Sequence, residues 1–132
     1  MRRLADEPPS VCSHCVAVFY TGLDGYSCYR IPSIIHTSRG TLLAFAERRA
    51  TSCGDDGEDH ALVLKRSVDG GSNWGPTIVV RQGEPPCDGC PAAISNPNPV
   101  EVALADGSMA VMRLPFASLE VACTQPPCCL LC

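Results

Sequence analysis

The chain has 132 residues, a formal net charge of −4 at pH 7 and no cluster of basic residues. A length of this order allows about one domain. The acidic balance argues against nucleic acid as the main partner, because phosphate contacts need clustered Lys and Arg. No apolar run approaches the ~20 residues of a membrane span. Residues 1–9 lack the apolar stretch of a signal peptide, and the compartment stays open.

Ten cysteines are many for a chain of this length. Such density usually indicates disulfides or a metal site. Two CxxC pairs, Cys12 with Cys15 and Cys87 with Cys90, could supply four thiolates to zinc, but they lie much further apart than the ~15–20 residues of a ribbon-type zinc site. We therefore favour unpaired thiols or opportunistic disulfides. A small zinc or disulfide protein is kept as a third hypothesis.

The first half of the chain predicts one antiparallel meander. Residues 1–15 are charged and aperiodic, which predicts an extended or disordered lead, and the apolar residues 16–20 predict a short strand. The run at residues 41–47 is apolar at nearly every position, as expected of a strand buried on both faces. The four strands of the predicted meander are residues 30–36, 41–47, 61–67 and 77–81.

A second meander is expected to begin after a long connection. Residues 82–99 are rich in Pro and Gly. Strands are then predicted at residues 100–104 and 108–114, with a hairpin turn between them. Residues 115–132 have no period and no turn signals, and this Cys-rich tail cannot be placed in a sheet.

Four motifs in this order resemble the opening of an exo-α-sialidase, or neuraminidase. Together they extend over about residues 26–114. They are the Phe/Tyr-Arg-Ile-Pro motif at Tyr29-Arg30-Ile31-Pro32, the following strand at residues 42–49, a complete Asp-box at Ser67-x-Asp69-x-Gly71-x-x-Trp74, and an Asn-Pro segment at residues 96–100. The resemblance implies an all-β fold, a six-bladed β-propeller. Residues 16–114 would be the first blade and part of the second.

The resemblance also implies a site for a carboxylate. Sialic acid carries a carboxylate on its anomeric carbon, and a guanidinium is a planar fork that meets both carboxylate oxygens. Arg30 resembles the first member of the family's three-arginine clamp. Arg49 matches the next family arginine, which helps to bind the carboxylate and the 4-hydroxyl side of the sugar. Asn96 is a further implied substrate-binding residue, whereas Arg48 is interpreted as a surface charge.

The acidic loop between the second and third strands holds the implied acid. Counting back from Arg66-Ser67 places the family's acid/base aspartate on Asp56, with Asp55 as the alternative. A neighbouring carboxylate helps to keep one carboxyl protonated, as protonation of a leaving oxygen requires. Glu58 and Asp59 are interpreted as solvated loop charges.

The Asp-box is interpreted as structural. Ser67 and Asp69 can bond turn amides, Gly71 can adopt positive φ, and Trp74 can fold back as an apolar plug. Asp-boxes also recur in β proteins that are not glycosidases. The alternative function is therefore a noncatalytic Asp-box β module that binds sialylated glycans.

The resemblance implies hydrolysis of terminal sialic acids from glycoproteins, glycolipids such as gangliosides, or oligosaccharides, with no metal or organic cofactor. In the family a tyrosine attacks with retention, an exception among glycosidases. Tyr20, Tyr26 and Tyr29 lie at the wrong end of the family order for that role. The later blades would supply the nucleophile and two clamp arginines, so we expect the 132 residues by themselves to be inactive. Strand alternation predicts Arg30, Arg49 and Asp56 at one edge of the meander and Trp74 at the other.

Overall fold

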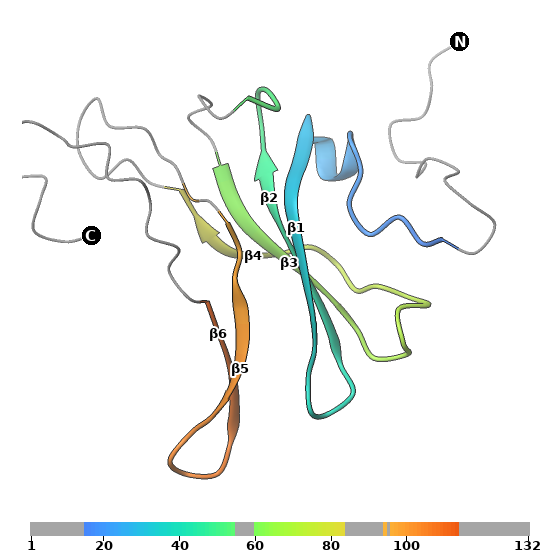
Figure 1. Cartoon of the computed structure of the whole chain (residues 1–132). Coiled ribbons are helices and arrows are strands. Elements are labelled where there is room, and N and C mark those ends of the chain that lie inside the picture. Colours follow the sequence, from blue (N-terminus) through green and yellow to red (C-terminus); the bar gives the residue numbers. More distant parts are fainter. Residues whose placement is uncertain (1–14, 55–59, 84–93, 95, 114–132) are drawn as a thin grey trace, which may run out of the picture.

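A computed structural model describes residues 15–54, 60–83, 94 and 96–113. Four strands form one antiparallel sheet in the order β1-β2-β3-β4, and two further strands form a separate hairpin (Figure 1). The strands are β1 (Cys28–His36), β2 (Leu42–Arg49), β3 (His60–Ser67), β4 (Ile78–Gln82), β5 (Pro99–Ala103) and β6 (Met109–Arg113). The predicted meander and the hairpin after it are thus confirmed, with strand ends shifted by one or two residues.

The strand predicted at residues 16–20 is wrong. This segment has no strand structure and leads into a 3-10 helix, η1 (Leu23–Gly25). The Phe19 ring instead stacks on Tyr29, with centroids 5.3 Å apart. The segment is apolar because it covers one face of the sheet, and apolar content alone does not distinguish such a cover from a paired strand.

Each face of the sheet has its own apolar cluster, so the prediction that the second strand is buried on both sides is confirmed. Ala46, Ala61 and Val63 are almost fully buried on the face that Phe19 and Tyr29 cover. The opposite face buries a second cluster, with Leu43 and Leu64 packed against it. Its buried members are Phe45, Leu62 and Ile94.

The first strand is interrupted where the Arg-Ile-Pro motif lies. Its pairing with β2 shifts between Arg30 and Ser33, so the strand contains a β-bulge at Ile31 and Pro32. Ile31 has φ of 51°, a left-handed conformation that costs a β-branched residue about 1–3 kcal/mol. Pro32 cannot donate to the ladder and is tolerated at a bulge. Bulges re-aim the neighbouring side chain, and here that side chain is Arg30.

The turn between β3 and β4 is built by the Asp-box. The Ser67 hydroxyl accepts a hydrogen bond from the Gly71 N–H at 2.9 Å. Asp69 accepts from the backbone and side-chain N–H groups of Asn73 at 2.9 and 2.7 Å. The Trp74 indole N–H donates to the Gly71 carbonyl at 3.0 Å. Backbone and side-chain bonds from Asn73, and then the Ser67 hydroxyl, lower the pKa of Asp69 to about 2.

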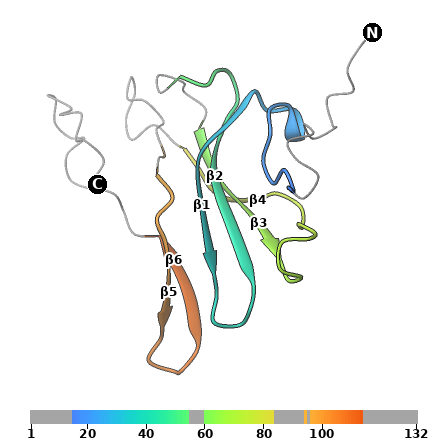
Figure 2. The ribbon, with the colours of Figure 1, turned by 45° about the vertical axis from the view of Figure 1, so that its right-hand side comes forward.

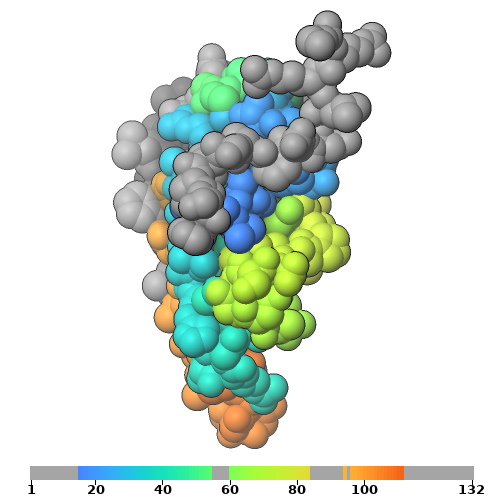
Figure 3. Space-filling model, turned by 90° about the vertical axis from the view of Figure 1, so that its right-hand side faces the viewer, coloured from blue at the N-terminus to red at the C-terminus, as the bar shows by residue number. Residues whose placement is uncertain are grey.

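The hairpin lies beside β1, as two views of the ribbon show (Figures 1 and 2). Glu101 of β5 accepts hydrogen bonds from Ser38 in the β1–β2 turn, at 2.7 Å from its N–H and 3.1 Å from its hydroxyl. In the space-filling view the tips of these two hairpins lie together at the lower end of the molecule (Figure 3). Their contact fixes the hairpin against the face that carries Phe45.

Candidate active site

Arg30 and Arg49 lie together where β1 begins and β2 ends, as strand alternation predicts. We call this end of the strands the arginine edge. Arg30 pairs with Glu47 across β1 and β2, and Cys28 pairs with Arg49. Side chains of directly paired residues lie on the same face of a sheet, so all four project from one face. Trp74 lies at the opposite edge, because it follows Ser67 and Ser67 pairs with the first residue of β2, Leu42.

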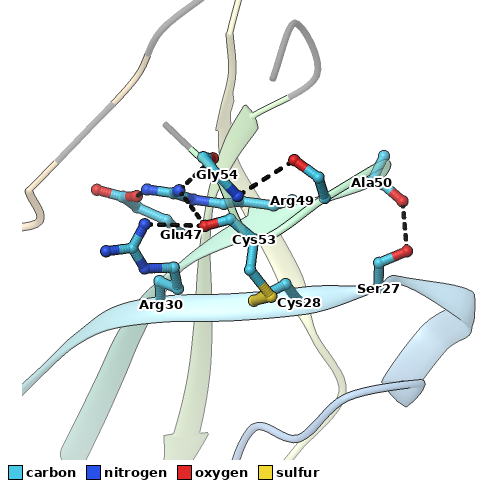
Figure 4. The surroundings of a disulfide bond; sticks show 9 residues. Ser27, Cys28, Arg30, Glu47, Arg49, Ala50, Cys53 and Gly54 are labelled. Carbon is cyan, nitrogen blue, oxygen red and sulfur yellow. Dashed lines mark hydrogen bonds and ion pairs between the residues drawn. A yellow bond between two sulfur atoms is a disulfide. The ribbon is translucent and has the colours of Figure 1, made fainter. Parts of the chain in front are cut away.

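Both guanidinium groups bind one backbone carbonyl. The Arg30 Nη1 donates to the Cys53 oxygen at 2.9 Å, and the Arg49 Nη1 donates to the same oxygen at 3.0 Å (Figure 4). Arg49 Nη1 also donates to the carbonyl of Gly54. Two cations from different strands thus converge on one point at the start of the acidic loop.

Glu47 holds Arg49 from the other side. Its Oε2 accepts from Arg49 Nη2 at 2.6 Å, with 1% of the Glu47 side chain and 3% of the Arg49 side chain exposed. Its Oε1 accepts from the backbone N–H of Asn96 at 2.7 Å. Burial of an ion pair costs desolvation energy that the attraction barely offsets, so such a pair is weak evidence for stability. Its observable effect is to fix the Arg49 side chain and the segment before β5.

The other predicted site residues are placed less directly. Asn96 is brought to the site through its backbone, with φ of 53°, a conformation that Asn tolerates. Asp55 and Asp56 lie outside the described residues, as do Glu58 and Asp59. The acidic loop leaves β2 beside the arginines, since Gly54 is the last residue described before it.

Arg48 lies on the opposite face from Arg49 and has partners of its own. Its guanidinium carbon is 3.9 Å from the centroid of the Tyr26 ring, and its Nη2 donates to the Gln82 side chain at 3.0 Å. The expected surface charge is therefore half-buried and stacked on an aromatic ring. It does not share the carbonyl that Arg30 and Arg49 bind.

Tyr29 points away from Arg30, toward Phe19. Its hydroxyl donates to the Leu23 carbonyl at 3.0 Å. Burial, and next the charge of Asp24, raises its pKa to about 12. The Tyr29 side chain thus lies on the opposite face from Arg30, since it pairs with Arg48.

Two features of the site were not anticipated from the sequence. One is Glu47, whose signal is a carboxylate inside an apolar strand and two residues from an arginine, hence on the same face. The other is a disulfide between Cys28 and Cys53, which spacing alone could not single out among ten cysteines. Of the two CxxC pairs, Cys12, Cys87 and Cys90 lie outside the described residues. Within the described ranges no group of three or more His, Cys, Asp or Glu side chains could hold a metal ion.

A small cavity lies apart from the two arginines. It lies between the sheet and the hairpin, is lined by apolar groups such as Phe45, Val80 and Val111, and has a volume of about 60 Å³. Pockets for small ligands are usually about 300–1,000 Å³. This cavity is smaller than such a pocket.

Comparison with known proteins agrees with the motifs. Part of the chain is 38% identical over 63 residues to a sialidase of Micromonospora viridifaciens, covering 48% of this chain and 10% of the relative. A sialidase of Bacteroides fragilis (strain YCH46) is 39% identical over 59 residues, covering 45% of this chain and 11% of the relative. This chain is partly homologous to bacterial sialidases. No protein-family model matches it.

The homology is limited in extent. The chain spans about a tenth of the length of the curated relatives it matches. The described residues form a mostly β structure, a four-stranded antiparallel sheet with a hairpin, which is consistent with one blade of a propeller. None of their helices is long and apolar enough to cross a membrane.

Proposed function

We propose that this chain contributes the first blade and part of the second of a six-bladed exo-α-sialidase, which removes terminal sialic acids from glycoproteins, glycolipids or oligosaccharides. The observation that carries the proposal is the convergence of Arg30 and Arg49 on the Cys53 carbonyl, in a chain partly homologous to sialidases. A carbonyl oxygen that accepts from two guanidinium groups occupies a position where a carboxylate oxygen could also accept.

In this proposal each residue has its own role. Arg30, on the exposed side of the shared carbonyl, would form charged hydrogen bonds to the sugar carboxylate. Arg49, fixed by Glu47, would support the same carboxylate and the 4-hydroxyl side. Asp56, on the loop that begins beside both arginines, would protonate the leaving oxygen, with Asp55 as the alternative. Asn96, held at the site through Glu47, would line the sugar from the second blade.

A chimera tests the function without requiring activity from the isolated chain. The matching 63-residue segment of the first bacterial relative is replaced by the segment of this chain, and release of sialic acid is measured. Arg30→Ala and Arg49→Ala should each lower kcat/KM by about ten- to a hundredfold, since a charged hydrogen bond contributes about 1.5–3 kcal/mol. Arg48→Ala, on the opposite face of the same strand, is the matched control and should retain activity.

The same chimera tests the acid. Asp56→Ala should lose most turnover on natural glycans and far less on an aryl sialoside, whose phenol-like leaving group needs little protonation. Asp55→Ala should not lower turnover on either substrate. A folded chimera that gives equal losses for Arg48→Ala and Arg30→Ala would contradict the clamp, and equal losses of Asp56→Ala on both substrates would assign Asp56 to binding or folding.

A further inference from the structure

We propose that the Cys28–Cys53 disulfide is a positioning device of the carboxylate site, because it holds the Cys53 carbonyl against both arginines and thereby fixes the spacing of their guanidinium groups. This inference rests on the proposed function, in which those groups bind the sugar. Nothing in the motifs of the sheet requires a disulfide at this place. Figure 4 shows the bond directly beneath the shared carbonyl.

The disulfide encloses both arginines in the chain. Cys28 lies two residues before Arg30 on the same face of β1, and Cys53 lies four residues after Arg49, beyond the end of β2. The two Cα atoms are 5.4 Å apart, and the bond spans 25 residues of sequence. Residues 50–54 have no ladder partner, so the disulfide is a covalent tie of this segment to β1.

The shared carbonyl lowers the electrostatic repulsion between the two arginines. Two guanidinium groups repel each other, and an acceptor placed between them offsets that repulsion. The Cys53 oxygen has two lone pairs and accepts from Arg30 at 2.9 Å and from Arg49 at 3.0 Å. A carbonyl can do this only if its backbone is held in place. The sulfur bridge lies on the residue that carries that carbonyl.

Reduction should therefore loosen the arginines selectively. A dithiol reductant breaks the S–S bond by supplying two electrons and two protons, so that two cysteine thiols form and the dithiol becomes a cyclic disulfide. Residues 50–54 then lose their covalent tie to β1, and the guanidinium groups lose a fixed common acceptor. Arg49 keeps its bond to Glu47. Arg48 should be unaffected, because its partners are Tyr26 and Gln82 on the other face.

The test measures how fast phenylglyoxal modifies each arginine of the full 132-residue chain, read by peptide mass spectrometry. Three samples are compared: the oxidised chain, the chain treated with a dithiol, and Cys28→Ser/Cys53→Ser. Arg30 and Arg49 should be modified about tenfold faster in the last two, a ratio equivalent to about 1.4 kcal/mol. Arg48 should change less than about twofold, and reoxidation of the wild-type chain should restore protection.

Two matched variants separate positioning from general stability. Ser27→Ala removes another tie between the same segments, the 2.8 Å bond from the Ser27 hydroxyl to the Ala50 carbonyl, but keeps the disulfide, so both arginines should stay protected. Cys128→Ser/Cys129→Ser removes two other cysteines and should leave the modification rates of both arginines unchanged. Equal acceleration at Arg48, as from general unfolding, would overturn the proposal, as would unchanged rates at Arg30 and Arg49.

The measurement involves no sialoside, so its outcome is independent of the chimera assay. If the modification rates of Arg30 and Arg49 do not change when the disulfide is broken and the chimera is active, only the positioning proposal is wrong. If breaking the disulfide accelerates modification of both arginines but Arg30→Ala leaves the chimera's activity unchanged, the proposed function is wrong. The disulfide and the arginines would then have a structural role only.

Discussion

At the scale of single residues, Glu47 belongs to the arginine cluster, because it binds Arg49 directly. Arg30 and Arg49 could be singled out from the sequence because each belongs to a motif with fixed spacing. Glu47 lies in the same motif strand, but its burial and its pairing with Arg49 were not predicted, because a carboxylate is usually solvated. Only the cross-strand register shows that Glu47 faces Arg30, and only the packing shows that it is buried.

Replacement of Glu47 gives a direct test of its role. Glu47→Gln leaves the Arg49 cation buried without a counter-charge, and loss of one partner of a buried pair costs about 3–5 kcal/mol. We expect the free energy of unfolding, measured with urea, to fall by about that amount. Glu101→Gln keeps one oxygen to accept from the Ser38 N–H, and its amide can donate to the Ser38 hydroxyl, so it should cost less than about 1 kcal/mol. Equal losses for the two variants would show that Glu47 carries no buried charge pair.

At the scale of elements, turns and strands were predicted well where local chemistry determines them. The Asp-box turn has Ser67, Asp69 and Gly71 in the geometry that its residue types favour. The bulge at Ile31 was not anticipated, since positive φ in a β-branched residue has no local signal. The strand predicted at residues 16–20 failed for a similar reason, because tertiary packing on Phe19 decides that segment.

The Asp-box also predicts a pH dependence. Hydrogen bonds from Asn73 and Ser67 lower the pKa of Asp69 from 3.8 to about 2. The unfolded chain therefore binds a proton that the folded chain does not at intermediate pH, so stability is present above the unfolded value and lost as pH falls through about 4 to 2. Asp69→Asn should flatten this decline in urea unfolding.

A matched variant is available in the other hairpin. Hydrogen bonds from the side chain and backbone of Ser108 lower the pKa of Asp106, so Asp106→Asn should remove a separate part of the same slope. The double variant should be the flattest of all. If Asp69→Asn keeps the full wild-type slope, the Asp-box carboxylate does not control acid stability.

At the scale of the whole molecule, order in the sequence predicted more than composition did. Meander, turn and hairpin followed from alternation and turn residues, and the expected edge for the arginines followed from strand direction. The pairing of the cysteines could not be predicted from sequence order, because a disulfide depends on which Cα atoms approach within about 7 Å. The pairing of Cys28 with Cys53 becomes visible only after β1 and β2 are aligned.

The proposed sialic acid site is tested most directly by a crystal structure of the active chimera with an unsaturated sialic acid analogue bound. We predict that the analogue's carboxylate lies within hydrogen-bonding distance of both Arg30 and Arg49, beside the Cys53 carbonyl, with Glu47 still bonded to Arg49. A carboxylate bound away from this edge, with both arginines occupied only by the backbone of residues 53–54, would contradict the assignment of a sialic acid site to this sheet.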